Sequence, residues 1–190
     1  DGIRDSVASR GLGDVYKRQD LTLFKFQEMN LEIRSASKGD MEDVLSLIKE
    51  LAIYEKEPNA VAISSSDLIN HAFTKPPLFV CFVALLESKI VGMSLGYPRY
   101  STWKGPTMHL EDLIVTKKHR GLGIGQALFS NFIKYSHDRG VRRIEWAVLN
   151  WNISAIKFYE SNGAKVSEDW HIAQMDEKAI NNFIIKNENI

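Results

Sequence analysis

The 190-residue chain has a single cysteine, five prolines and no net formal charge. One cysteine excludes an intrachain disulfide. That residue, Cys81, lies in the apolar run 78–86, which favours a buried structural thiol in a reducing, cytoplasmic setting. Because positive and negative charges balance, a broad surface for nucleic acid or membrane lipid is not expected. No apolar run approaches the roughly 18 residues that a membrane span requires.

The start of the chain carries little structural signal. Residues 1–28 lack the apolar core of a signal peptide, and Met29 stands directly before a strand-like segment. We interpret residues 1–28 as a disordered leader, non-native or removed by processing, outside the fold. Residues 29–190 have the length of one domain, and the chain's apolar content of 44% and charged content of 25% are ordinary globular values.

Apolar periodicity in residues 29–190 predicts strands and helices in a mixed order. Strands are expected at residues 29–36, 78–86, 89–97, 107–116 and 141–149, with a last strand or hairpin at 164–175. Helices are expected at residues 40–54 with Asp40 as the N-cap, at 64–73, from a glycine-rich turn to Arg139, and at 154–161, with a final helix or tail at 178–185. Residues 98–106 are expected to form a loop. This order predicts an α/β domain whose mixed, mostly antiparallel sheet carries helices on both faces.

The most informative stretch is a strand-like apolar run, residues 113–115, followed by the basic segment 117–120 and three glycines. Apolar residues then recur at helical spacing up to Tyr135. Unpaired N–H groups at a helix N-terminus and the helix dipole favour bound phosphate, and glycine lets the backbone approach it closely. The stretch therefore predicts a phosphate or pyrophosphate site, with Arg120 placed to neutralise its charge. The spacing fits neither a P-loop nor the dinucleotide-binding fingerprint.

Residues 120–125 read Arg-Gly-Leu-Gly-Ile-Gly, and this segment resembles the acetyl-CoA loop of GNAT N-acetyltransferases. Further motifs, in the same order, resemble the spermidine/spermine N-acetyltransferase group, which includes thialysine (diamine) acetyltransferases. They are residues 47–52 (Leu-Ile-Lys-Glu-Leu-Ala) with Tyr54-Glu55, residues 110–112 (Leu-Glu-Asp), Trp151-Asn152, and Phe158-Tyr159 with Gly163-Ala164. The resemblance covers residues 29–176 and implies a single GNAT domain.

The resemblance implies an acetyl-CoA-dependent N-acetyltransferase that acts by direct attack in a ternary complex. The acceptor would be a primary amine of a small diamine, polyamine or lysine-like molecule, and members of the family are commonly homodimers. The polyamine enzymes carry an acidic residue where this chain has Ser101. A smaller amine, such as a lysine analogue or a short diamine, is therefore at least as good a candidate for the acceptor as a long polyamine. The histidines show no metal-ligand spacing, so no metal is expected.

The resemblance also implies residue roles. Tyr159 would be the acid that protonates the leaving thiolate, and Glu111 the base that takes the proton of the amine, directly or through a water. The residues expected to contact acetyl-CoA are Leu113, Ile114, Val115, Arg120, Gly121, Leu122, Gly123, Ile124, Gly125, Gln126, Asn152 and Ala155. Those expected to hold the amine are Tyr54, Glu55, Glu111, Trp103 and Trp146, with Glu145, Glu168 and Asp169 as further candidates.

Simpler interpretations of the same residues stay open. Phe158 and Tyr159 also fit an aromatic core pair. Glu111 and Asp112 also fit ordinary ion pairs, and because successive strand residues face opposite sides, only one of them is expected to point into an amine site. His109 is interpreted as a structural hydrogen-bonder rather than a proton carrier.

Two other functions also stay open. A protein or peptide N-acetyltransferase would use the same cofactor but an open groove in place of an acidic pocket. A catalytically silent CoA-binding regulatory domain would keep the glycine loop without needing Tyr159 and Glu111.

Overall fold

The computed structural model describes residues 29–187, so the leader predicted at residues 1–28 lies outside the described residues. The described elements are, in order, β1 (Leu31–Ser35), η1 (Lys38–Asp40), α2 (Met41–Tyr54), α3 (Ser65–Ala72), β2 (Val80–Leu86), β3 (Lys89–Ser101), β4 (Gly105–Val115), η2 (Lys117–His119), α4 (Ile124–His137), β5 (Ile144–Glu145), α5 (Ile153–Ser161) and α6 (Glu177–Lys186). The chain divides into two compact units between Ala147 and Val148. The first unit contains the sheet and helices α2 to α4, and the second contains α5 and α6.

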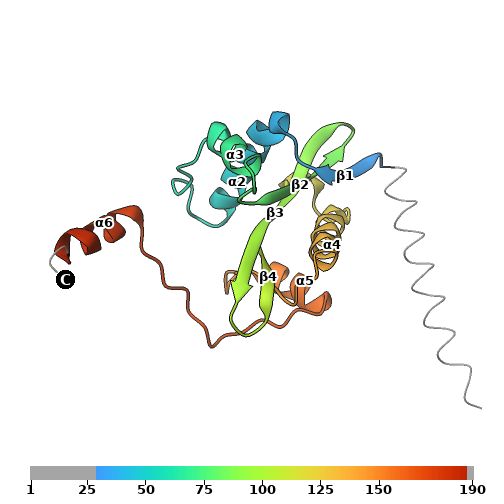
Figure 1. Cartoon of the computed structure of the whole chain (residues 1–190). Coiled ribbons are helices and arrows are strands. Elements are labelled where there is room, and N and C mark those ends of the chain that lie inside the picture. The colour runs from blue at the N-terminus through green and yellow to red at the C-terminus, as the bar shows by residue number, and fades with distance from the viewer. Residues whose placement is uncertain (1–28, 188–190) are drawn as a thin grey trace, which may run out of the picture. The chain divides into compact units, whose positions relative to one another are not determined.

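The first unit is built on a five-stranded sheet with the strand order β1-β2-β3-β4-β5. The strands from β1 to β4 are antiparallel neighbours, and β5 runs parallel to β4. Helices α2 and α3 lie on one face of this sheet, and α4 lies on the other (Figure 1). The predicted mixed, mostly antiparallel sheet with helices on both faces is confirmed.

Alternation along the strands divides the core between the two faces. Cys81 and Val83 of β2 pack with Val44 of α2. Phe82, between them, faces the other way, and its ring meets that of Tyr135 of α4 at a centroid distance of 5.1 Å. Burial raises the pKa of the Cys81 thiol to about 12, so the thiol is protonated and unreactive at neutral pH. The prediction of a buried structural thiol is confirmed.

Two glycines of β3 let α4 approach the sheet. A Cβ atom at Gly96 would lie 2.5 Å from the ring of Phe132, and one at Gly92 would lie 3.1 Å from a methyl group of Leu128. Phe132 and Leu128 are both fully buried. The helix that follows the glycine-rich turn is therefore seated against the middle of the sheet, and this contact fixes where its N-terminus lies.

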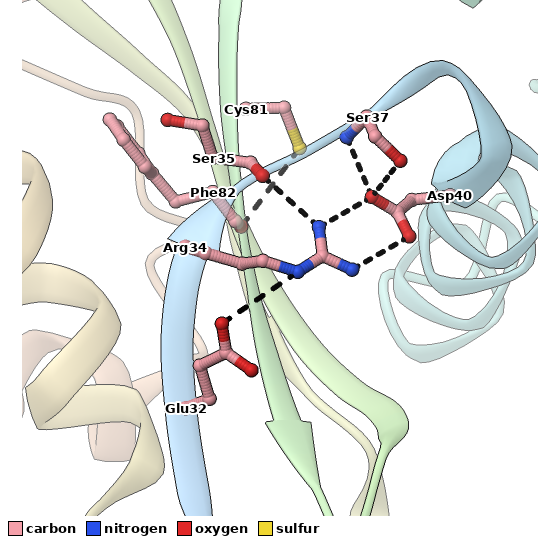
Figure 2. Close-up of polar contacts among 7 residues, drawn as sticks. All are labelled: Glu32, Arg34, Ser35, Ser37, Asp40, Cys81 and Phe82. Atoms are coloured by element: carbon pink, nitrogen blue, oxygen red, sulfur yellow. Dashed lines mark hydrogen bonds and ion pairs between the residues drawn. The ribbon is translucent and has the colours of Figure 1, made fainter.

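An ion pair joins β1 to the start of α2 (Figure 2). The Arg34 guanidinium donates from Nη1 to Asp40 Oδ2 at 2.7 Å and from Nη2 to Oδ1 at 3.0 Å. Asp40 Oδ2 also accepts from the backbone N–H and the hydroxyl of Ser37, at 2.6 and 2.8 Å. Hydrogen bonding from Arg34 holds the pKa of Asp40 well below its usual range. Asp40 is the N-cap residue of α2, as predicted, but its side chain makes no capping hydrogen bond to that helix. The carboxylate instead accepts from the Ser37 N–H in the capping box of η1.

Most of the other predicted boundaries are confirmed to within a few residues. Helix α3 begins after Ser64, whose hydroxyl accepts a hydrogen bond from the Asp67 N–H. Helix α4 ends shortly before Gly140, which has a φ of 68°. Asn152 caps α5 by accepting from the Ala155 N–H. Helix α6 occupies the segment predicted as a final helix or tail.

The loop predicted at residues 98–106 is wrong. Strands β3 and β4 both extend into it, and only residues 102–104 form the turn of a long hairpin. Pro98 is tolerated in the strand because it lies past Gly96, the last β3 residue paired with β2. At that position β3 has a strand on one side only, where proline is compatible with a sheet.

The strand predicted at residues 141–149 is confirmed only at β5, and the described segment 164–175 contains no strand. Strand β5 pairs with Met108 and His109 of β4, and the pairing stops directly before a register shift in β4. Such a shift bends a strand and interrupts its ladder, so the rest of 141–149 has no regular edge to follow. In the segment 164–175 Trp170 is 78% exposed, so the alternating apolar residues that predicted a strand there do not correspond to a buried face.

The Arg34–Asp40 pair should be measurable as acid-sensitive stability. Replacing Asp40 with asparagine should lower the free energy of unfolding by roughly 2 kcal/mol at pH 7, because a partly buried guanidinium loses its carboxylate. Since the pKa of Asp40 is lower in the folded than in the unfolded chain, its contribution is complete above about pH 4 and is lost as the pH falls further. Urea unfolding at pH 7 and at pH 3 measures the difference, which should shrink at pH 3.

Asp43→Asn is the matched control, because Asp43 is an exposed aspartate in the first turn of α2. This variant should change the free energy of unfolding by no more than about 0.5–1 kcal/mol. An Asp40→Asn protein as stable as the wild type at pH 7 would contradict the assigned role of the ion pair.

Candidate active site

A β-bulge interrupts the pairing of β3 with β4. Leu95 pairs with Asp112 and Gly96 pairs with Leu110, so Glu111 is an extra residue on β4 with no β3 residue opposite it. A bulge of this kind bends the strand and redirects the side chains on either side of it. It lies in the segment 110–112 that the sequence singled out.

The bulge changes which face of the sheet β4 presents. Leu110 lies opposite Gly96 and shares the α4 face, because paired residues of antiparallel strands point the same way. Asp112 lies opposite Leu95, a member of the core under α2, and shares the α2 face. The strict alternation expected to separate Glu111 from Asp112 therefore does not hold, since it assumed a regular strand.

Three carboxyl groups gather beside the bulge, and we call Glu55, Glu111 and Asp112 the acidic group. Asp112 is half-buried, and burial together with the negative charges of Glu111 and Glu55 raises its pKa to about 7. Partial burial raises the pKa of Glu55, which directly follows α2. Like charges held together in a partly buried place are unfavourable until a cation joins them. The acidic group therefore suits a positively charged ligand.

Two ring side chains lie next to Glu111. Tyr97 and His109 pair across β3 and β4, and their rings stack with centroids 5.2 Å apart. His109 Nε2 lies 3.6 Å from Glu111 Oε2. Burial, and then the charge of Glu111 and a hydrogen bond to it, raise the pKa of the Tyr97 hydroxyl. The Nδ1 atom of His109 is buried and makes no hydrogen bond within residues 29–187, so the interpretation of His109 as a structural hydrogen-bonder is not supported.

The glycine-rich turn joins η2 to α4. Gly121 and Gly123 have φ values of 76° and 88°, in the left-handed region that favours glycine, and Gly123 is the N-cap of α4. A Cβ atom at Gly121 would meet nothing within 4 Å, and one at Gly125 would first meet Val115 at 3.7 Å. The turn is therefore open beside the first residues of a 14-residue helix, whose N–H groups and dipole attract an anion.

Two contacts hold this turn to the end of α2. The Arg120 guanidinium lies 5.1 Å from the ring centroid of Tyr54, and its Nε donates to the Val115 carbonyl at 2.9 Å. The Lys117 N–H donates to Glu50 Oε1 at 3.0 Å. Two residues predicted for different roles, Arg120 for acetyl-CoA and Tyr54 for the amine, are thus brought together.

One edge of β4 past the bulge has no strand beside it in the described chain. Residues 113–115 pair with β3 on one side. On the other side, β5 reaches only Met108 and His109. An extended ligand with amide groups can pair with such an edge in the manner of an added strand.

The second unit carries the remaining residues predicted for the cofactor and the acid. The Asn152 side-chain oxygen accepts from the Ala155 N–H at 3.2 Å and starts α5. Tyr159, on the same helix, is 9% exposed, and its ring lies edge-on to that of Phe158 with centroids 5.3 Å apart. The aromatic pair expected from the spacing is thus present in α5.

Other predicted amine contacts are not brought together with the acidic group. Trp103 is 79% exposed in the turn of the β3–β4 hairpin. Trp146 meets Phe129 of α4 edge-on, with ring centroids 5.7 Å apart, so it packs with the helix on the face opposite Asp112. Glu145 is already paired with Arg143 at 3.0 Å.

Among residues 29–187 there is no group of three or more His, Cys, Asp or Glu that could hold a metal ion. None of the helices in the described chain is both long enough and apolar enough to span a membrane.

Residues 43–164 match the model of the acetyltransferase (GNAT) family. The match runs from α2 to just past α5, and it includes the bulge, the glycine-rich turn and Tyr159. The chain belongs to the GNAT acetyltransferase family. It is an N-acetyltransferase, and GNAT enzymes use acetyl-CoA as their co-substrate.

Similar proteins support both the sequence group and the fold. The thialysine N-epsilon-acetyltransferase of Bos taurus is 36% identical over 159 residues, which cover 78% of this chain and 94% of the relative. That of Caenorhabditis elegans is 35% identical over 158 residues, which cover 81% and 97%. A solved integron cassette protein from the mobile metagenome of V. cholerae aligns with a TM-score of 0.67 at 24% identity, over 82% of this chain and 98% of the other. The predicted resemblance and GNAT fold are confirmed.

Three features of this GNAT site carry no clear signal in the sequence. The bulge has none, because Glu111 looks like any polar strand residue. The place of Tyr97 beside Glu111 depends on the register of β3 and β4, and only a count back from the hairpin turn would reveal it. The stack of Arg120 on Tyr54 joins segments that are far apart in the chain.

The raised pKa of Asp112 predicts that Asp112→Asn stabilises the ligand-free enzyme. The pKa is about 7 in the folded chain and about 4 in the unfolded chain, so ionisation weakens the fold progressively as the pH rises between these values. The advantage of the asparagine should grow from pH 4 to pH 7, then level off at about 1–2 kcal/mol, or a few degrees in Tm. Calorimetry at pH 5 and pH 8.5 measures it. A variant less stable than the wild type at pH 8.5 would exclude this account.

The turn geometry predicts that Gly123→Val abolishes acetyl-CoA binding while leaving the far-UV dichroism largely intact. A β-branched residue at this φ strains the turn and blocks the close approach of a pyrophosphate. Gly140→Val is the matched control, because Gly140 also has a positive φ but lies at the other end of α4. Isothermal calorimetry should show binding by the control only. Normal affinity in Gly123→Val would remove the turn from the site.

Proposed function

We propose that this protein acetylates a primary amine of a small diamine, polyamine or lysine-like molecule, with acetyl-CoA as the donor. The observation that carries the proposal is the acidic group at the bulge of β4. Amines of this class are cations at neutral pH, and carboxyl groups that raise one another's pKa gain most from a bound cation. The names of the two relatives, thialysine N-epsilon-acetyltransferases, support the same class of acceptor.

The ammonium must lose a proton before it can attack, because it has no lone pair. Glu111 is our candidate for the base, since it is exposed at the bulge and interacts with both Tyr97 and His109. Asp112 is the counter-charge, because the approach of a cation favours the ionised form of a carboxyl whose pKa is about 7. General-base help of this kind contributes about 10²–10⁴-fold to a rate.

The acetyl group then moves in one step within a ternary complex. The amine nitrogen forms a bond to the thioester carbonyl carbon and releases its second proton to solvent. The C–S bond breaks, the departing thiolate takes a proton from Tyr159, and the tyrosinate regains a proton from solvent. A tyrosine of ordinary pKa, about 10, is protonated at neutral pH and so has a proton to give. The role of Tyr159 comes from the resemblance to the GNAT enzymes, as do the cofactor contacts of Asn152 and Ala155.

We assign acetyl-CoA to the glycine-rich turn and to the open edge of β4. The pyrophosphate would meet the N–H groups at the start of α4, with Arg120 nearby as a positive charge. The amides of the pantetheine arm would pair with residues 113–115, where β5 does not reach. Both features come from one continuous segment of the first unit, which fixes their separation.

The hairpin turn favours a short acceptor. The Ser101 hydroxyl accepts from the N–H groups of Trp103 and Lys104, each at 3.2 Å, and so serves to close the turn. It brings no charge for a distant second or third amine of a long polyamine. A lysine analogue or a short diamine is therefore at least as suitable an acceptor as a long polyamine. Homodimeric assembly and a cytoplasmic location stay predictions of the resemblance and the composition.

A thiol-release screen tests the proposed function. The acceptors are short diamines, polyamines, lysine analogues, free amino acids and a lysine-containing peptide, each with acetyl-CoA. Thiol release with the small amines, and little with the peptide, is the expected result. Release with the peptide alone would instead identify a protein acetyltransferase. Binding of acetyl-CoA without release with any acceptor would identify a silent regulatory domain.

Two variants should separate the proton-handling steps. Tyr159→Phe should lower kcat by about 10²-fold or more with little change in acetyl-CoA affinity, because only the proton for the thiolate is lost. Glu111→Gln should lower kcat most at low pH, where more of the amine is protonated, and recover in part at high pH. Steady-state kinetics from pH 6 to pH 10 measures both.

Tyr100→Phe is the control for the loss of a tyrosine hydroxyl, because Tyr100 is 73% exposed on the hairpin. Its kcat should match that of the wild type. A Tyr159→Phe enzyme with wild-type kcat over the whole pH range would refute the acid assignment.

A further inference from the structure

His109 has a place that packing alone does not explain. Its side chain is 17% exposed and stacks on Tyr97, yet its buried Nδ1 makes no hydrogen bond with any described residue. A buried polar nitrogen without a partner costs stability, so its presence calls for another reason. The other ring nitrogen, Nε2, faces the Glu111 carboxylate at 3.6 Å.

We propose that His109 is a positioning residue that receives the substrate's proton from Glu111 and passes it to solvent. This inference rests on the proposed function, in which Glu111 takes that proton from the bound ammonium. It gives Glu111 a way to return to the carboxylate form before the next amine arrives.

The proton can be followed through each bond. The N–H bond of the ammonium breaks as an O–H bond forms on Glu111. The O–H bond then breaks as an N–H bond forms at the lone pair of His109 Nε2, which leaves a carboxylate and an imidazolium. The imidazolium gives a proton to water, so no oxidant, reductant or further reactant is needed. Proton-transfer contacts are often long in ligand-free sites, and imidazole exchanges protons readily near neutral pH.

Among the neighbouring carboxylates, Glu111 is the one whose charge is available to interact with the His109 ring. Glu145 of β5 lies opposite His109 in register, but it is bound by Arg143 at 3.0 Å and by Arg99 at 3.7 Å, so its charge is already balanced. The titratable and charged groups around the relay are Tyr97 and Arg99 of β3, Glu111 and Asp112 of β4, Arg143 and Glu145 at β5, and Glu55 after α2.

The test compares two replacements of His109 in the full chain. His109→Gln keeps a polar side chain but does not titrate, and His109→Phe keeps a ring to stack on Tyr97. Both should lower kcat by about 10-fold or more, with the KM for the amine and the Kd for acetyl-CoA changed less than about twofold. The shape of the profile of kcat against pH should differ from that of the wild type in both variants. Added free imidazole should restore much of the activity of His109→Gln.

His137→Gln is the matched control, because the His137 side chain is 87% exposed on α4. It should behave as the wild type and show no response to imidazole.

The outcomes separate the relay from the proposed function. The proposed function is tested without His109, by two measurements. It requires that the wild-type enzyme acetylates a small amine and that Glu111→Gln loses this activity. If His109→Gln then keeps the wild-type kcat and pH profile, the relay is overturned while the proposed function stands. Loss of activity that imidazole does not restore, together with a lower Tm or weaker acetyl-CoA binding, also overturns the relay and assigns His109 a structural role.

Discussion

The extra residue in β4 is the constraint on which the rest of the site depends. Because Glu111 has no partner on β3, β4 changes face between Leu110 and Asp112. A regular strand would keep both on the α4 face, and Asp112 would be buried beneath that helix instead of standing beside Glu55. The same shift ends the pairing of β5 at His109 and leaves residues 113–115 with a free edge. One inserted residue thus produces both the acidic face and the open edge.

Two aspartates of the first unit have pKa values shifted in opposite directions by their neighbours. Asp40 has a bidentate arginine and a serine as partners, and the pKa of its carboxyl is lowered. Asp112 stands among other carboxylates, and its pKa is raised. The first arrangement stabilises the ligand-free fold, whereas the second weakens it. Raised carboxyl pKa values of this origin are more typical of binding and catalytic sites than of structural ones.

The sequence predicted the parts of this molecule that depend on local pattern. The helices, the glycine-rich turn and the antiparallel strands follow from periodicity and from capping residues such as Ser64 and Asn152. Features that depend on register between distant segments were not predictable, because pattern gives no pairing. The hairpin around Pro98 and the short β5 were therefore misjudged, since both depend on what lies beside a strand and not on the strand's own residues. The candidate site residues were predicted from the resemblance to the family. Their neighbours, such as Tyr97, were identified only in the folded structure.

The end of α2 connects the two halves of the site. Glu50 and Tyr54 hold the segment that carries the glycine-rich turn, and Glu55, the next residue, belongs to the acidic group. At its other end, α2 follows directly from Asp40, which Arg34 ties to the edge strand β1. A helix fixed at both ends places the turn and the carboxylates at a set separation. The proposed ternary complex requires such a separation, because direct transfer needs the amine and the thioester to meet on the enzyme. The contacts that hold α2 in place therefore also support the proposed function.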